Sequence, residues 1–257
     1  MDLVQRLTPA VEETICSLSG LLMREGIPFA VVGATAFLLQ DSRFIRGTRD
    51  LDLAIATAGG VAAIRSTLLE NGLQGTDTEH RFRVPGGMDV DVLGFDPDWE
   101  PSHEIPQRLG GTISAAGVPE SITHALPLTL GVCETRIAPL HLLIATKLGT
   151  SVIPTRRDDL EDALHAMLSF EETGTRRFEL DYDSYGALEI EIRGALLAGL
   201  DAGKQLLDES QTAILQAIDV LLEDPRLRDR QVEDLDALDL VTAFHRGLLD
   251  GVNTAAD

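Results

Sequence analysis

Two aspartates stand one residue apart in the segment RGTRDLDLAI, residues 46–55. The segment alternates in the manner of a β-strand, so Asp50 and Asp52 share one face while Leu51 and Leu53 point the other way, into a core. Two carboxylates held side by side repel each other unless they face a cation. Only together with further carboxylates would this spacing predict a site for a hard divalent cation, which prefers carboxylate oxygens.

A second alternating segment supplies further carboxylates. In HRFRVPGGMDVDVLGF, residues 80–95, two alternating runs flank a Pro-Gly-Gly turn, which is typical of a β-hairpin. Asp89 and Asp91 share one face of its second strand. If that strand lies beside residues 50–56, up to four carboxylates gather on one patch. Two Mg²⁺ ions held there together with a nucleoside triphosphate would stabilise an in-line displacement at phosphorus.

Each carboxylate pattern also has an ordinary structural interpretation. A D-x-D pattern on a strand is often a pair of solvated surface aspartates. In the hairpin, Arg81 and Arg83 share one face. They either reach a substrate or balance Asp89 and Asp91 across the hairpin.

A glycine turn precedes the first aspartates. Residues 27–33, IPFAVVG, form an apolar run that predicts a buried strand, and residues 34–40 look helical. The backbone N–H groups of Gly33, Ala34 and Thr35 would then open a helix, where they can bind phosphate.

The surrounding pattern predicts an α/β (α+β) fold: a small mixed sheet with flanking helices, followed by a C-terminal helical region. We expect a first domain over residues 1–170 and an acidic, mostly helical region over 171–257, with helix breaks near Asp224-Pro225 and Gly251. Residues 96–120, rich in Pro and Gly, read as loop. The remaining predicted helices and strands cover residues 8–24, 59–72, 125–140, 139–150 and 158–168, and Thr8 is the predicted N-cap of the first of them.

Composition narrows the class of protein. The net charge is −21, and residues 171–257 contribute −12 of it through 8 basic and 20 acidic side chains. Nucleic-acid binders normally present a basic surface, which this chain lacks overall. The two cysteines, Cys16 and Cys133, suit reduced cytosolic thiols and no zinc motif. With no apolar run that predicts a membrane span and no secretion signal, we expect a cytoplasmic protein with no membrane partner.

The order of these motifs resembles that of the polymerase-β-like nucleotidyltransferase superfamily: a glycine turn, D-x-D on the next strand, then a third carboxylate on a neighbouring strand. VVGATAFLL followed by RGTRDLDLAI is further similar to AbiEii/AbiGii-type nucleotidyltransferases, which are toxins of type IV toxin–antitoxin pairs. The later block IAPLHLLIATKLGTSVIPTRRDDLEDAL, residues 137–164, looks like that family's downstream element. The resemblance covers roughly residues 27–168.

The resemblance implies transfer of a nucleoside monophosphate from an NTP to an acceptor hydroxyl, with release of pyrophosphate. It implies that Asp50, Asp52 and Asp91 hold Mg²⁺ or Mn²⁺, with Asp91 also acting as general base or orienting the hydroxyl. Either Asp89 or Asp91 could be the third carboxylate, and the sequence VDVLG favours Asp91. The remaining nucleotide-binding residues that it implies are Gly33, Ala34, Thr35, Arg46, Thr48, Lys147, Arg157 and Asp159.

Some of these residues have alternatives. Lys147, one of two lysines in the chain, either contacts the triphosphate as a point charge or is a solvated helix lysine. Asp158 and Asp159 also suit an ordinary helix N-terminus. Ala34 replaces the second glycine or serine of the family's first motif.

The sequence leaves several classes of acceptor for the nucleoside monophosphate. Resemblance to the toxins implies an RNA such as tRNA, or a protein, with a cognate antitoxin as a partner. The net charge of −21 weighs against RNA and favours a small molecule such as an antibiotic. A catalytically inactive binding module of the same fold is the third alternative, to which Ala34 points.

Overall fold

The structure is a computed structural model, and it describes residues 7–40, 50–98, 104–106, 112–153 and 156–255. The chain forms two compact units, Met1–Pro139 and Leu140–Asp257. Within the described ranges, no helix combines the length and apolar character needed to span a membrane.

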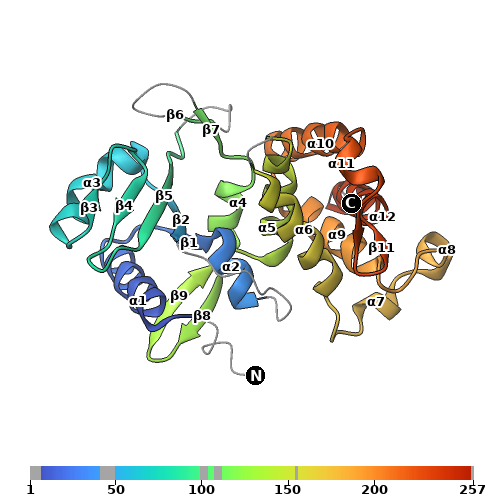
Figure 1. Ribbon diagram of the computed structural model, residues 1–257, viewed down its shortest axis with the longest axis horizontal. Coiled ribbons are helices and arrows are strands. Elements are labelled where there is room, and N and C mark those ends of the chain that lie inside the picture. The colour runs from blue at the N-terminus through green and yellow to red at the C-terminus, as the bar shows by residue number, and fades with distance from the viewer. Residues whose placement is uncertain (1–6, 41–49, 99–103, 107–111, 154–155, 256–257) are drawn as a thin grey trace. The chain divides into compact units, whose positions relative to one another are not determined.

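The first unit is built on a seven-stranded sheet with the strand order β3-β4-β5-β2-β1-β9-β8 (Figure 1). The pairs β2–β5 and β1–β9 are parallel, and the other neighbours are antiparallel. The predicted mixed sheet is therefore confirmed. The strands are β1 (Phe29–Val32), β2 (Asp50–Ala56), β3 (Gln74–Gly75), β4 (Arg81–Arg83), β5 (Asp89–Phe95), β8 (Leu126–Leu130) and β9 (Cys133–Ile137).

Helices flank this sheet, as the sequence predicts. Helix α1 (Pro9–Arg24) begins at the expected N-cap Thr8, whose side chain accepts a hydrogen bond from the Val11 amide. Helix α2 (Gly33–Gln40) follows β1 directly, and α3 (Gly60–Glu70) packs on β5 and β2. The segment 96–120, expected to be loop, instead includes the hairpin β6 (Glu104–Pro106) and β7 (Thr112–Ser114) and the start of α4 (Val118–Thr123).

A disulfide joins α1 to the sheet. Cys16 of α1 and Cys133 at the start of β9 are bonded, with their Cα atoms 5.7 Å apart. Close by, the hydroxyls of Ser19 and Thr135 form a buried hydrogen bond of 2.7 Å along the same contact. The expectation of two reduced thiols is wrong for this structure, because the fold brings together cysteines that are 117 residues apart. The cytoplasmic location that rested partly on it stays a prediction.

The second unit is helical. Its main helices are α5 (Leu140–Ser151), α6 (Arg157–Ser169), α9 (Arg193–Gln205), α10 (Asp208–Leu222) and α12 (Ala237–Ala255). Helix α5 packs on α6, α9 and α10, and α6 packs on α9 and α12 (Figure 1). The compact units therefore divide at Pro139, before the boundary near residue 170 that we expected for the functional domain. The short elements are α7 (Arg176–Glu179), α8 (Tyr182–Tyr185), α11 (Pro225–Arg228), β10 (Gln231–Val232) and β11 (Leu235–Asp236).

Helix α12 continues through a glycine where the sequence predicts a break. Helix α12 runs through Gly251, so the break expected there is wrong, whereas α10 ends before Asp224-Pro225 as predicted. A Cβ at Gly203 of α9 would lie 3.1 Å from the Cα of Gly251. The two helix backbones pack closely at this point, and glycine in both helices leaves the space for it.

Candidate functional site

The four strand aspartates lie at neighbouring positions of β2 and β5. In the parallel pairing of these strands, Asp50 stands opposite Asp89 and Asp52 stands opposite Asp91. All four occupy half-buried positions, whereas the residues between them, Leu51 and Val90, are fully buried. Neighbours in register share one face of a sheet, so the expected gathering of four carboxylates is confirmed.

Gly33 joins β1 to α2 and lies against the side chain of Asp52. The residue before it, Val32, pairs with Asp52 across the antiparallel ladder. Gly33 has φ +64°, in the left-handed region that favours glycine. A Cβ at this position would lie 2.6 Å from the Cγ of Asp52. Both the backbone conformation and the space beside the carboxylate therefore require glycine here.

Thr35 and Ala34 form the first turn of α2, and both are buried. The Thr35 hydroxyl donates a hydrogen bond of 3.3 Å to the backbone carbonyl of Asp50. This bond ties the start of β2 to the start of α2, and so helps to set the position of the D-x-D pair. A direct contact of Thr35 with phosphate stays a prediction, as does the phosphate-binding role of the whole turn.

Arg81 holds the third candidate carboxylate. It stands opposite Asp91 on the antiparallel strands β4 and β5. Its Nε donates to Asp91 Oδ1 at 2.7 Å and its second guanidinium nitrogen donates to Oδ2 at 2.6 Å, so both oxygens accept. The hydrogen bonds from Arg81 to Asp91 raise the pKa of the guanidinium above its usual value; burial opposes this, and the charges of Asp91, Asp89 and Asp50 add to it.

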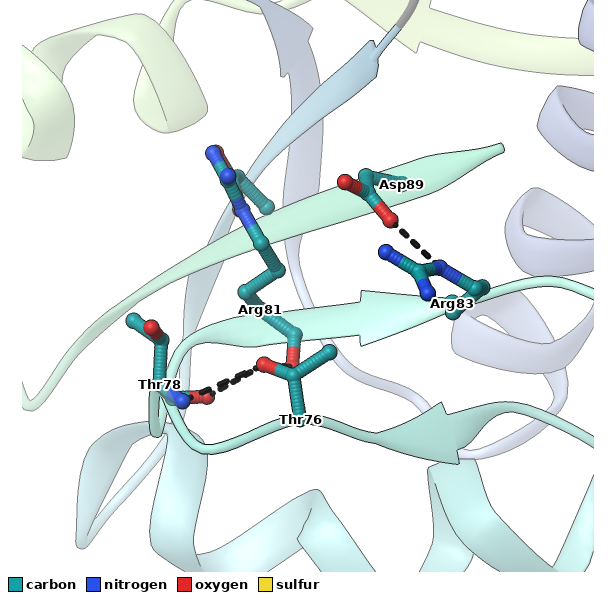
Figure 2. A network of polar contacts seen from close by, with 6 residues as sticks. Thr76, Thr78, Arg81, Arg83 and Asp89 are labelled. Atoms are coloured by element: carbon teal, nitrogen blue, oxygen red, sulfur yellow. Dashed lines mark hydrogen bonds and ion pairs between the residues drawn. The ribbon is translucent and has the colours of Figure 1, made fainter. Parts of the chain in front are cut away.

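A second arginine–aspartate pair lies two residues away along the same two strands. Arg83 stands opposite Asp89, and its Nε donates to Asp89 Oδ1 at 2.9 Å, as Figure 2 shows. This hydrogen bond lowers the pKa of the Asp89 carboxyl below its usual value. Of the two interpretations of these arginines, the structure shows the balance across the hairpin. The signal was present in the sequence as R-x-R and D-x-D on either side of one tight turn.

The residues on this face are of the kind that binds a divalent cation, but their side chains are not arranged to hold one. Four carboxylates in register are oxygen ligands of the kind that Mg²⁺ and Mn²⁺ bind, and Gly33 lets the Asp52 side chain pack directly against the turn, where a Cβ would collide with it. However, both oxygens of Asp91 are taken by Arg81. Among the described residues, no group of three or more His, Cys, Asp or Glu side chains is placed to hold a metal ion.

Lys147 lies in the second unit and forms a compact ionic cluster with α6. Its Nζ contacts Asp159 Oδ1 and lies 3.2 Å from Asp162 Oδ2. Thr150 completes the cluster by donating a hydrogen bond of 2.7 Å to Asp159 Oδ2. The alternative of a solvated helix lysine is wrong, because the Lys147 side chain is only 15% exposed.

The Asp159 side chain forms contacts within this cluster and does not act as an ordinary helix cap. The N-cap of α6 is Arg156, whose side chain makes no capping hydrogen bond. The Arg156 side chain instead adds a longer ion pair of 3.6 Å to Asp159. The predicted nucleotide-binding roles of Lys147 and Asp159 stay predictions.

Three of the predicted site residues cannot be placed. Arg46 and Thr48 lie outside the described residues. Arg157 is the first residue of α6, and its side chain is likewise outside what the structure describes.

Seven chains of solved structures match this chain, and two of them are described here. No protein-family model and no curated protein matches the sequence. An antigenic nucleotidyltransferase-like protein from Paracoccidioides brasiliensis aligns at 16% identity over 63% of this chain and 77% of its own, with a TM-score of 0.41. CdnC of E. coli MS115-1, solved in a CdnC:HORMA-deltaN complex, aligns at 14% identity over 96% of this chain and 83% of the matched chain, with a TM-score of 0.29. Both TM-scores are below 0.5, so any assignment of activity depends on the site itself.

Proposed function

We propose that this chain is a cation-dependent nucleotidyltransferase that moves a nucleoside monophosphate from an NTP to an acceptor hydroxyl. One observation carries the proposal: two D-x-D strands pair in parallel register, and the glycine turn after β1 lies directly against one of their carboxylates. A turn that requires glycine beside carboxylates can bring phosphates close to the ligands of a cation.

The chemistry assigns a task to each part of this face. Asp50, Asp52 and Asp91 would hold Mg²⁺ or Mn²⁺, which when bound supplies positive charge for a displacement at the α-phosphorus. The acceptor oxygen forms a bond to the α-phosphorus, the bond to the bridging oxygen breaks, and pyrophosphate leaves. The hydroxyl proton passes to a carboxylate, for which Asp91 is the candidate. The N–H groups of Gly33, Ala34 and Thr35 would receive the β- and γ-phosphates.

Further nucleotide contacts belong to the proposal through the resemblance of the sequence blocks. Arg46 and Lys147 would bind the triphosphate as cations, with Thr48 supporting the turn before β2. Arg157 and Asp159 would complete the nucleotide site. Lys147 already has competing contacts, because Asp159 and Asp162 surround its ammonium group.

The acceptor is proposed at the level of class. An RNA such as tRNA, or a protein, fits a toxin of the AbiEii type with an antitoxin partner. The net charge of −21 opposes long-range attraction of RNA, which leaves a small-molecule hydroxyl as a further acceptor. Expression should arrest growth if the chain is a toxin and should not if it modifies a small molecule.

A second candidate function is a catalytically inactive binding module of the same fold. The bidentate ion pair between Arg81 and Asp91 favours it, because it neutralises the third carboxylate from within the chain. Such a module should bind nucleotide, if at all, without dependence on a divalent cation.

Transfer of α-phosphate label tests the proposal. Each of the four common α-labelled NTPs would be incubated with Mg²⁺, the protein and one acceptor class: total RNA, cell protein, or a panel of antibiotics. We expect label on one class for the native chain and none for Asp52→Asn. Asp89→Asn and Asp91→Asn form a matched pair that identifies the third carboxylate. Absence of label on every acceptor, with cation-independent nucleotide binding, would establish the inactive module instead.

A further inference from the structure

A pocket of about 600 Å³ lies at the end of the sheet away from the aspartates. It is lined by Ala56 and Phe95, the last residues of β2 and β5, together with the start of β1, the end of α1, and α4. Asp50 begins β2, and Ala56 ends it about 20 Å further along the strand. The described residues that line the pocket all belong to the first compact unit. The pocket is therefore separate from the carboxylate face.

The walls of this pocket are mainly apolar. Helix α1 contributes Met23, the segment before β1 contributes Ile27 and Pro28, and α4 contributes Pro119 and Ile122. Met23 is 47% exposed, so part of the apolar surface is open to a ligand. A concave, largely apolar pocket of several hundred Å³ is the usual form of a small-molecule site. The volume and the lining together indicate a ligand with an apolar body.

One charged side chain, Arg136 of β9, stands among the described residues that line the pocket. Arg136 is exposed, and its guanidinium donates a long hydrogen bond of 3.4 Å to the Ala125 carbonyl. No acidic residue is among the described lining residues. A guanidinium carries several N–H donors, so one long hydrogen bond leaves donors for an anionic group of a ligand.

We propose that this pocket binds a small amphipathic monocarboxylate, whose apolar body lies against the pocket walls and whose carboxylate pairs with Arg136. The planar guanidinium matches the two oxygens of a carboxylate. A single arginine in a chain of net charge −21 balances one negative charge, but not the several charges of a nucleoside triphosphate. The proposal is independent of the proposed function, because no residue assigned to nucleotidyl transfer lines this pocket.

The apolar walls predict that affinity depends on chain length. Each methylene group that moves from water onto the pocket walls should tighten binding about fourfold. Hexanoate, octanoate and decanoate, each titrated into the full chain by isothermal titration calorimetry, should therefore bind with increasing affinity. Octan-1-ol has the same chain as octanoate without the charge, and we expect it to bind about threefold or more weakly, the size of an exposed ion pair.

An arginine variant tests the charged end of the site. Arg136→Gln should weaken octanoate binding to the level of octan-1-ol and leave the affinity for octan-1-ol unchanged. Arg24→Gln is the matched control, since Arg24 is an exposed arginine beside Met23 that does not line the pocket. It should leave the affinity for both ligands within about twofold of the native values.

An alanine variant tests the apolar end. Ala56→Leu should fill part of the pocket and weaken octanoate and octan-1-ol alike, whereas Ala58→Leu, at an exposed position outside the lining, should weaken neither. In methyl NMR spectra, octanoate should shift the signals of Ile27 and Ile122. If Ala56→Leu does not fold, Thr123→Leu narrows the same pocket from an exposed position at the end of α4.

The opposite results would overturn the inference. They are equal affinities for octanoate and octan-1-ol, an Arg136→Gln chain that binds octanoate as the native chain does, or no binding of any member of the series. Methyl shifts confined to residues outside the pocket would show adsorption elsewhere. Self-association of the chain that Arg136→Gln abolishes and octanoate does not affect, measured by analytical ultracentrifugation, would assign the pocket to a second copy instead.

Discussion

Two cation–carboxylate clusters in this molecule differ in how completely they are closed. On the sheet, the Arg81–Asp91 pair is open to solvent on the arginine side and has further carboxylates beside it. In the helical unit, Lys147 is enclosed by Asp159 and Asp162, whose side chains are 10% and 3% exposed. The closed cluster ties α5 to α6, whereas the open pair leaves its guanidinium in contact with solvent.

This difference separates two residues that carry the same charge. Lys147 is a predicted triphosphate contact, whereas Arg81 was expected either to reach a substrate or to balance the hairpin aspartates. Burial makes Lys147 expensive to detach, because two buried carboxylates would lose its ammonium group. The Arg81 side chain is 40% exposed, so its contact with Asp91 contributes less. The burial of the carboxylates around a cationic side chain is thus more informative about its role than its charge.

Removing the cation of the closed cluster, Lys147, should have the largest effect on stability. Lys147→Met removes the ammonium group that contacts the buried Asp159 and Asp162, and we expect the free energy of unfolding to fall by about 3–5 kcal/mol. Urea denaturation followed by circular dichroism measures it. Arg156→Ala, which removes only the 3.6 Å outer pair to Asp159, is the control and should change stability by under about 1 kcal/mol. A Lys147→Met chain as stable as the native one that has lost NTP binding would instead assign Lys147 to the nucleotide.

Placing a methyl group against the Asp52 side chain should have the next largest effect on stability. Gly33→Ala places a methyl group against the carboxylate at a positive φ, and we expect a loss of about 2–3 kcal/mol together with loss of Mn²⁺ binding. Gly26→Ala is a matched control, since Gly26 has φ +68° but nothing within 4 Å of its Cβ position. It should cost about 1 kcal/mol and leave Mn²⁺ binding unchanged. Equal effects of both variants would show that only backbone strain matters at Gly33.

The smallest effect concerns the second open pair. Arg83 lowers the pKa of the Asp89 carboxyl, so the contribution of this pair to stability is present above the ordinary carboxyl pKa of about 3.9 and is lost as the pH falls through the lowered value. Arg83→Ala should raise the pKa of Asp89 toward about 3.9. A carboxyl ¹³C NMR titration measures it, with Arg81→Ala as the comparison, since Arg81 contributes less to this shift. An unchanged pKa in Arg83→Ala would mean that the pair does not persist in solution.

Local patterns predicted the elements of the site well. The alternation of DLDLAIA and GGMDVDVLGF predicted two strands with their aspartates on one face, and both strands formed within a residue or two of their expected bounds. The helix cap at Thr8 and the hairpin around residues 84–88 followed in the same way. These features depend on neighbours a few residues apart, which the sequence displays directly.

Features that depend on distant neighbours were predicted poorly. The disulfide joins Cys16 to Cys133, and α12 continues through Gly251, where Gly203 of α9 lies beside it. The exclusion of solvent from Lys147 likewise depends on α6 folding back onto α5. None of these pairings leaves a periodic trace in the sequence.

The sequence by itself determined which chemistry is present: four strand aspartates, a glycine turn before them, and two arginines on the strand that precedes the second pair. Only the tertiary structure decided which of those side chains contact one another. The parallel pairing of β2 with β5 set the aspartates side by side, and the antiparallel pairing of β4 with β5 assigned Arg81 to Asp91. Alternation fixes the face of each side chain within its own strand, but the register between strands chooses its partner.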